Sequence, residues 1–149
     1  MSVVPYVKLD CGILDSSLWI DRDSRTVFIT MLLMAVPYEL RIAVPVIEID
    51  SLTPSNWIIA PDWYGFVPAA STGVITRAGL DIPHGMAALR RLAAPELESR
   101  NPRYDGRRIG RVDGGFIILN YDSYRGKDHT SAERSRRYRQ RQKSGIVTT

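Results

Sequence analysis

The stretch AASTGVITRAGLDIPHGMAALRRLA, residues 69–93, decides the fold. Its first half places Val74, Ile75 and Ala78 at one-turn helical intervals, and Gly79 then supplies the left-handed conformation that commonly ends a helix. Asp81 is a strong N-terminal cap for a second helix that runs to about Ala93. The stretch therefore predicts two helices joined by a short turn, which is a helix-turn-helix.

The second of these helices has two unlike faces. Its apolar face, which we expect to be buried, carries Ile82, Met86, Leu89 and Ala93. The outward face, the candidate recognition surface, carries His84, Ala87, Ala88 and Arg91. We expect His84, Arg90 and Arg91 to contact DNA. Two alternatives stay open: His84 is an ordinary polar surface residue, and the two arginines form a solvated helix end favoured by the helix dipole.

Downstream of the helices, residues 107–120 read as a β-hairpin. The runs Arg107 to Val112 and Phe116 to Asn120 flank the turn sequence Asp113-Gly114-Gly115. Side chains alternate along a strand, so Arg108 takes one face while Arg107 and Arg111 take the other. At least one arginine face must then meet solvent or phosphate, and we expect all three arginines to bind DNA. The alternative is that these arginines only keep the strand faces soluble.

Upstream of residue 69, the sequence predicts one helix followed by β structure. Apolar residues recur at helical spacing from Val27 onwards, which predicts a helix from about Arg22 to Ala35 that Pro37 ends. Prolines then interrupt residues 37–65 repeatedly, which favours two β arms inserted before the helix-turn-helix. The aromatic residues of this insertion are either core or an exposed contact patch; they are Trp57, Trp63 and Tyr64.

The charge of the chain is concentrated near its end. Residues 125–143 contain 8 Lys/Arg and 2 Asp/Glu, a local charge of +6, whereas the whole chain is +4 and the first 124 residues are −2. We expect one domain over residues 1–125 and a basic tail over 126–149 that is disordered or helical and binds a polyanion. Its expected phosphate contacts are Arg134, Arg136, Arg137, Arg139, Arg141 and Lys143. The alternative is a tail that only aids solubility.

The order of helix, helix-turn-helix and hairpin predicts an α+β fold of the winged helix-turn-helix class, with the hairpin as the wing. Two segments resemble sequences of bacteriophage and prophage replication-organiser proteins. They are Leu14-Asp15-Ser16-Ser17-Leu18-Trp19 and Arg111-Val112-Asp113-Gly114-Gly115. That resemblance implies DNA binding in replication initiation or organisation. Longer members of the group engage a helicase through a further C-terminal domain, and because the sequence ends at Thr149 we do not expect helicase loading.

Other roles of the same fold stay open. One is transcriptional control, and another is a protein-interaction adaptor that uses residues 37–65. Winged helices often pair on DNA, so a homo-oligomer stays open, as do contacts with replication proteins.

Composition and motifs argue against several other classes. Cys11 is the single cysteine, and with only two histidines it cannot complete the usual zinc site or close an internal disulfide. No run approaches the roughly 18 apolar residues of a membrane span, and no signal peptide is visible, so we expect a cytoplasmic protein of a bacterial host cell. Nothing in the sequence holds the acids Glu48, Asp50 and Asp62 together as a nuclease site would require. We therefore expect no enzyme, no metal and no cofactor.

Overall fold

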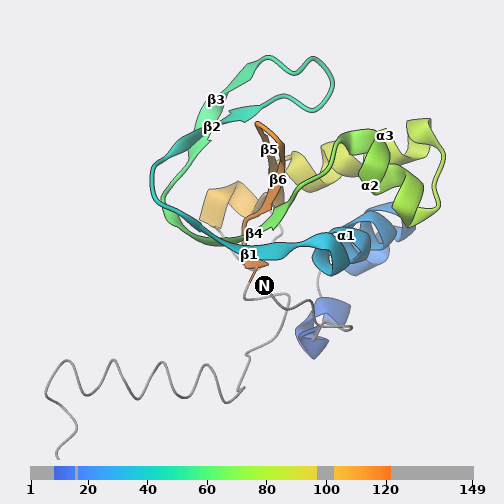
Figure 1. The fold of residues 1–149 in the computed structure, drawn as a ribbon. Helices are drawn as coiled ribbons and strands as arrows, with labels where there is room; N and C mark the ends of the chain where they lie inside the picture. The colour runs from blue at the N-terminus through green and yellow to red at the C-terminus, as the bar shows by residue number, and fades with distance from the viewer. Residues whose placement is uncertain (1–8, 16, 97–102, 122–149) are drawn as a thin grey trace, which may run out of the picture.

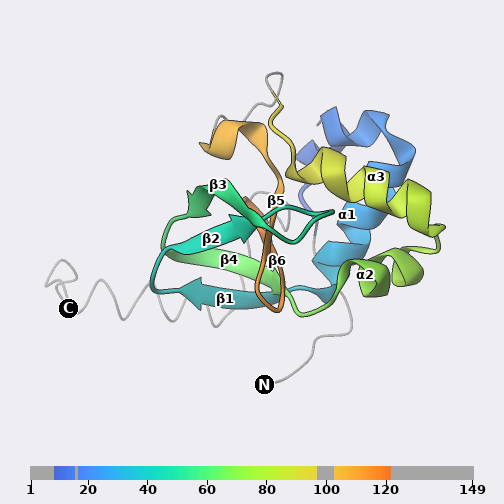
Figure 2. The ribbon, with the colours of Figure 1, turned by 90° about the horizontal axis from the view of Figure 1, so that it is seen from above.

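The computed structural model describes residues 9–15, 17–96 and 103–121. Within them the fold is α+β, as predicted, with three α-helices and a six-stranded antiparallel sheet (Figure 1). The helices gather on one side of the molecule and the strands on the other (Figure 2). Short 3-10 helices, η1 (Cys11–Asp15) and η2 (Ser17–Ile20), precede the first α-helix, and η3 (Arg103–Gly106) precedes the last two strands.

Helix α1 (Arg22–Met34) confirms the predicted first helix. Asp21 caps it, because its carboxylate accepts a hydrogen bond from the backbone N–H of Ser24 at 3.2 Å. The helix ends where Pro37 enters the chain, and strand β1 (Val36–Leu40) begins at once. One face of α1 is fully buried against the other helices through Val27, Phe28, Met31 and Leu32.

Helices α2 (Ser71–Ala78) and α3 (Ile82–Ala93) confirm the predicted helix-turn-helix. Gly79 takes the left-handed conformation, with φ 77°, and Asp81 caps α3 through the N–H of His84 at 2.9 Å. The predicted faces of α3 are wrong in part. Its buried residues are Gly85, Ala88, Leu89 and Leu92, so Ala88 points inward while Ile82 is 45% exposed.

Helix α3 is turned about its axis relative to the predicted orientation because it contacts α2 at Gly85. The position lacks a side chain, and the side chain of Ile75 on α2 lies directly against it. A close approach at a glycine sets which face of α3 turns inward, and the periodicity of large apolar residues does not reveal it.

The sheet consists of two β-hairpins, and the strands of the first hairpin flank the second on both sides. Strands β1, β2 (Val44–Ile47), β3 (Pro54–Ile59) and β4 (Asp62–Val67) form a long, bent two-stranded hairpin, here called the clasp hairpin (residues 36–67), in which β1 pairs with β4 and β2 with β3. Strands β5 (Ile109–Val112) and β6 (Gly115–Ile118) form the inner hairpin (residues 109–118). The sheet order is β1-β4-β6-β5-β2-β3, so the two halves of the clasp hairpin pair with opposite edges of the inner hairpin.

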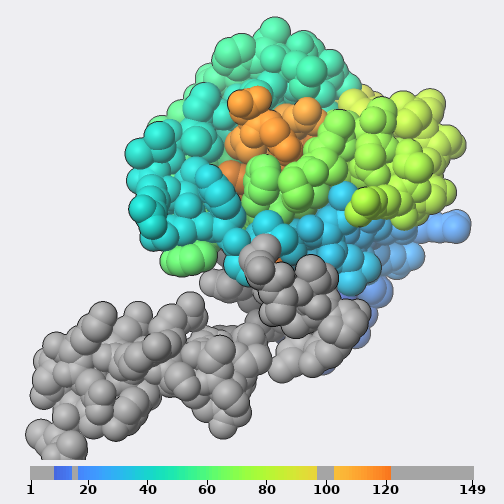
Figure 3. Space-filling view, viewed as in Figure 1, coloured from blue at the N-terminus to red at the C-terminus, as the bar shows by residue number. Residues whose placement is uncertain are grey.

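This sheet order corrects the interpretation of two predicted segments, residues 37–65 and the inner hairpin. Residues 37–65 do form β structure, as predicted, but they are integral to the sheet. The inner hairpin was predicted correctly, with Gly114 at φ 87° in its turn, yet both of its edges are paired and all four residues of β6 are buried. On the face of the molecule seen in Figure 3, it reaches the surface between the clasp hairpin and helices α2 and α3. Of the two arginine faces, the one that carries Arg108 is closed, since this residue is 5% exposed, whereas Arg107 and Arg111 on the other face are partly exposed.

The curled sheet divides the core in two. One face packs on the helices through Val67, Ile109, Phe116 and Ile118. The other face encloses a smaller core that includes Leu40, Val46, Ile59, Tyr64, Ile117 and Leu119. Of the three aromatic residues singled out in the sequence, Tyr64 is buried in this smaller core and Trp57 packs against it half-buried, whereas Trp63 is 54% exposed. Tyr64 and Trp57 thus belong to the core, whereas Trp63 is available for an external contact.

Candidate nucleic-acid interface

The outward side of α3 is the candidate interface within the folded body. His84, Arg90 and Arg91 are all exposed there, with side-chain exposures of 68%, 49% and 49%. Residues 84 and 91 are two helical turns apart and share one flank of the helix, while residue 90 lies toward the other flank. The structure therefore keeps the three residues on one helix surface, but each of them has an acidic partner.

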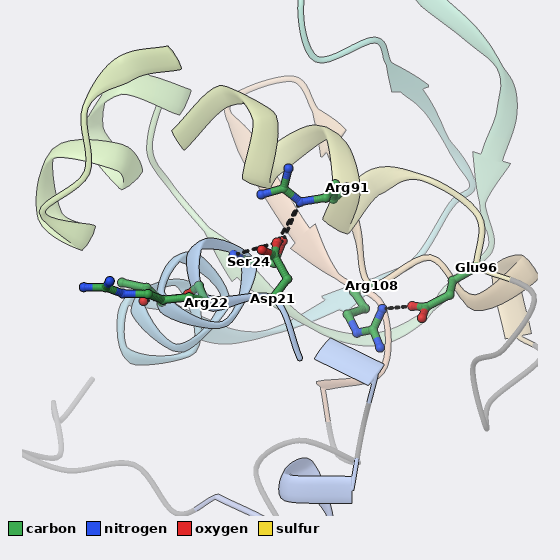
Figure 4. Close-up of polar contacts among 7 residues, drawn as sticks. Asp21, Arg22, Ser24, Arg91, Glu96 and Arg108 are labelled. Carbon is green, nitrogen blue, oxygen red and sulfur yellow. Dashed lines mark hydrogen bonds and ion pairs between the residues drawn. The ribbon is translucent and has the colours of Figure 1, made fainter. Parts of the chain in front are cut away.

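Arg91 is bound to the start of α1. Its Nε donates to the carboxylate of Asp21 at 2.7 Å and to the hydroxyl of Ser24 at 3.1 Å (Figure 4). Burial raises the pKa of the Asp21 carboxyl, but the hydrogen bonds from Ser24 and Arg91 outweigh it, and the pKa falls below its usual value. Asp21 thus stays ionised as both a helix cap and a partner of Arg91. The side chain of Arg22 points away from this cluster (Figure 4).

Arg90 is bound to the clasp hairpin. Its guanidinium donates to the carboxylate of Asp50 at 2.7 Å, across 40 residues of sequence. Asp50 lies in the turn between β2 and β3, next to Ile49, which is buried in the core of the helices. This contact therefore links the turn between β2 and β3 to one flank of the candidate surface.

His84 has a local partner. Its Nδ1 lies 2.8 Å from the carboxylate of Asp81, the residue that caps the helix. This hydrogen bond raises the pKa of His84 above its usual 6.5, and it also helps to lower the pKa of Asp81. Asp23 raises the pKa of His84 further, while the charge of Arg91 lowers it.

The three arginines of the inner hairpin do not join this surface. Arg108 is only 5% exposed and is paired with Glu96 (Figure 4). It also donates to the Ser17 hydroxyl at 2.8 Å. Arg107 lies over the ring of Trp57 at 4.5 Å. Arg108 is therefore enclosed within the fold, and the expectation that it is open to phosphate is wrong.

Arg111 lies at a third place, beside the start of α2. It donates to the Ser71 hydroxyl at 3.0 Å and stacks over Phe116 at 4.9 Å. The alternation of strand side chains placed Arg107 and Arg111 on one face, but twisting and curling of the sheet aim their guanidinium groups at different neighbours.

The charge balance of the body is slightly negative. The described residues contain 10 arginines and 12 carboxylates, which gives −2. Among them, Arg22 and Arg77 are exposed and take part in no ion pair. The excess positive charge therefore belongs to the rest of the chain. The predicted contacts Arg134, Arg136, Arg137, Arg139, Arg141 and Lys143 lie outside the described residues.

One polar cluster was not anticipated from the sequence. The Tyr64 hydroxyl donates to the carbonyl of Ala60 at 2.6 Å and lies 2.6 Å from the hydroxyl of Tyr104, while Arg103 donates to Asp62 at 2.8 Å. Burial and the hydrogen bond with Tyr104 raise the pKa of Tyr64 well above its usual 10.0. Tyr104 adopts a left-handed conformation, φ 56°, which a sequence pattern does not reveal.

The acids considered for a nuclease site are not assembled. Asp50 faces Arg90 in the turn between β2 and β3, whereas Asp62 faces Arg103 at the bend between β3 and β4. In the described residues, no group of three or more His, Cys, Asp or Glu side chains is arranged to hold a metal ion. None of the helices in this part of the chain has the length and apolar character needed to cross a membrane. Comparison of the chain with protein-family models, with curated proteins and with solved structures gave no match.

Proposed function

We propose that this protein binds nucleic acid, most simply DNA, with residues 125–143 supplying most of the contacts to phosphate. The observation that carries the proposal is the separation of charge: the described body has a net charge of −2, whereas residues 125–143 carry +6. Arginine suits this task because its planar guanidinium donates two parallel hydrogen bonds and keeps its charge at physiological pH.

The helix-turn-helix supports DNA as the target. In that motif the second helix enters the major groove with its N-terminal residues near the bases, and here His84 is exposed at that end of α3. The element order of helix, helix-turn-helix and hairpin is also that of winged-helix proteins. On these grounds we propose a winged-helix DNA-binding protein of phage or prophage type, which acts in replication initiation or organisation in the bacterial cytoplasm.

A salt titration tests this proposal. The full chain is compared with a variant in which six basic residues become glutamine: Arg134, Arg136, Arg137, Arg139, Arg141 and Lys143. If all six bind phosphates of duplex DNA, the slope of log affinity against log salt becomes shallower by about 5, because each contact contributes about 0.9. Equal slopes for the two proteins would refute the role of this segment, and absence of binding by the full chain in dilute buffer would refute the function.

Matched single-stranded DNA and RNA in the same titration identify the preferred nucleic acid. A binding-site selection on random duplexes separates replication from transcriptional control. Strong enrichment of one operator sequence supports a transcriptional regulator, since control of a promoter needs a large specificity ratio. Even binding to all sequences supports the replication role.

A protein-interaction adaptor is the second candidate, and the exposure of the clasp hairpin favours it. Trp63 is 54% exposed on β4, Ile58 is 59% exposed on β3 and Ile42, at the bend between β1 and β2, is 73% exposed. Exposed tryptophan is enriched where proteins bind one another. Trp63→Ala is the clean test, because Trp57 packs on the smaller core and its loss disturbs folding. Capture of a replication protein by the chain, abolished in this variant with DNA affinity intact, would support the adaptor.

A further inference from the structure

The turn of the clasp hairpin, here called the clasp tip (residues 48–53), reaches across to α3. The backbone N–H of Glu48 donates to the carbonyl of Thr53 at 2.8 Å, and Leu52 closes the turn in a left-handed conformation with φ 57°. Ile49 is 8% exposed within the helical core, and Asp50 beside it binds Arg90 at 2.7 Å. The tip is therefore fixed on the helix surface by one apolar and one charged contact.

The opposite flank of α3 has a matching arrangement. Asp21, at the start of α1, binds Arg91 at 2.7 Å. Successive helix residues differ by about 100° in direction, so Arg90 and Arg91 point to the two sides of the outward surface and a carboxylate from another element meets each of them. Two separate parts of the chain, residues 21 and 50, thus place negative charge on the same helix.

These two ion pairs are weak enough to exchange. The partners are 49% and 57% exposed in the Arg90–Asp50 pair, and 49% and 42% exposed in the Arg91–Asp21 pair. Half-exposed ion pairs contribute little to stability because water competes for both charges. The buried pair of Arg108 with Glu96 differs, since those side chains are 6% and 30% exposed. Phosphate accepts the same guanidinium hydrogen bonds as carboxylate does, so it is a direct competitor for Arg90 and Arg91.

We propose that Asp50 and Asp21 occupy the positions that two phosphates take when nucleic acid lies along α3, so that binding there exchanges carboxylate for phosphate. This inference rests on the proposed function. Until the exchange occurs, the carboxylates neutralise the arginines and repel other phosphates. Weak, sequence-independent contact with α3 is thereby suppressed, and residues 125–143 make the first attachment.

Asp50→Asn tests the exchange, and Glu48→Gln is its matched control. Both substitutions remove one negative charge from the clasp tip, but among the described residues the exposed Glu48 side chain forms no hydrogen bond or ion pair, whereas Asp50 binds Arg90. In the full chain, we expect Asp50→Asn to bind a labelled duplex about fivefold more tightly, which corresponds to ~1 kcal/mol, and Glu48→Gln to change affinity by less than about twofold. Equal effects of the two substitutions, or no effect of Asp50→Asn, would overturn the proposal.

Arg90→Gln completes a cycle of variants. In the wild-type chain its cost is reduced by the energy needed to displace Asp50, so we expect Arg90→Gln to lower affinity more strongly in the Asp50→Asn background. Equal losses in the two backgrounds would refute the exchange at this site. The Asp21→Asn variant repeats the test at Arg91, because asparagine keeps the helix cap that aspartate provides. Thermal unfolding of each variant verifies that it is folded.

Failure of this inference is distinguishable from failure of the proposed function. If the wild-type chain binds DNA with a steep salt dependence but Asp50→Asn behaves like Glu48→Gln, only the exchange is wrong. If no form of the chain binds nucleic acid in dilute buffer, the proposed function is wrong and the exchange with it.

Discussion

A methyl group built on Gly85 of α3 would lie only 2.5 Å from Cγ1 of Ile75 on α2, so the two helices meet at a point where no side chain fits. This contact sets the geometry of the helix-turn-helix. It also turns Ala88, one helical turn further along α3, fully into the core.

The first prediction concerns this contact. Gly85→Ala forces α2 and α3 apart and should destabilise the protein by about 1–3 kcal/mol, despite the higher helix propensity of alanine. Gly73→Ala is the control, since its new methyl group would meet only the Cβ of Ala69 at 3.7 Å and should stabilise the protein by up to about 1 kcal/mol. Urea unfolding measures both. A stabilising Gly85→Ala would show that the helices can separate without cost.

The second prediction concerns the buried arginine of the inner hairpin. Arg108→Met leaves Glu96 without its main partner and should cost about 2–4 kcal/mol of stability. Arg107→Gln should cost less than about 1 kcal/mol, because its partner Asp105 is 75% exposed. Any loss of DNA binding by the Arg108 variant should then follow the loss of folded protein seen by circular dichroism. A folded Arg108→Met chain that fails to bind DNA would instead assign this arginine to the interface.

The third prediction is a pH dependence of stability. Burial raises the pKa of Glu96, but hydrogen bonds from Arg108 and Ser17 outweigh it, so the pKa lies below the usual 4.5. A lowered folded-state pKa contributes stability that is present above about pH 4.5 and is lost as the pH falls through the folded-state value. We expect Glu96→Gln to be less stable than wild type at pH 6, with the difference shrinking on acidification. A difference that is constant from pH 6 to pH 3 would contradict this assignment.

The fourth prediction concerns the tyrosine cluster. Tyr64→Phe removes the hydroxyl that bonds Ala60 and Tyr104, and it should cost about 1–2 kcal/mol. Tyr38→Phe, at an exposed position on β1 with no hydroxyl partner among the described residues, should stay within about 0.5 kcal/mol of wild type. Denaturant unfolding compares the two. Equal costs would show that the Tyr64 hydroxyl adds nothing beyond the ring.

The fifth prediction concerns His84. The carboxylate of Asp81 raises the pKa of His84, so an NMR titration should give a lower midpoint for His84 in Asp81→Asn than in wild type. A raised folded-state pKa contributes stability below about pH 6.5 that is lost as the pH rises through the folded-state value. Wild type should therefore exceed Asp81→Asn in stability by more at pH 5.5 than at pH 8. Identical midpoints would remove Asp81 as the cause.

The sequence predicted the parts of the fold that depend on local signals. Pro37, Gly79 and Asp81 mark helix ends through their own backbone and capping chemistry, and each of these ends lies close to where these residues placed it. Periodicity was less reliable on α3, where Gly85 rather than a large apolar residue faces α2. A pattern of apolar residues is insensitive to such a contact because glycine carries no side chain.

The candidate interface was predictable only in part, because its contacts join distant parts of the sequence. Arg90 and Asp50 are 40 residues apart, and Arg91 and Asp21 are 70 apart, so no local pattern pairs them. The same holds for the sheet: the β content of residues 37–65 is visible in the sequence, but the pairing of β4 with β6 and of β2 with β5 depends on the whole fold. The acids that neutralise α3 were therefore missed.

The position of the inner hairpin between the two halves of the clasp hairpin also bears on the order in which the strands can pair during synthesis. Residues 36–67 leave the ribosome first, and the inner edges of β2 and β4 have no strand to pair with until residues 109–118 follow. We therefore expect the sheet to be completed by insertion of its middle strands, a pairing between segments far apart in the chain, which slows folding. We expect nascent chains halted after α3 to have two unpaired strand edges, which favour aggregation.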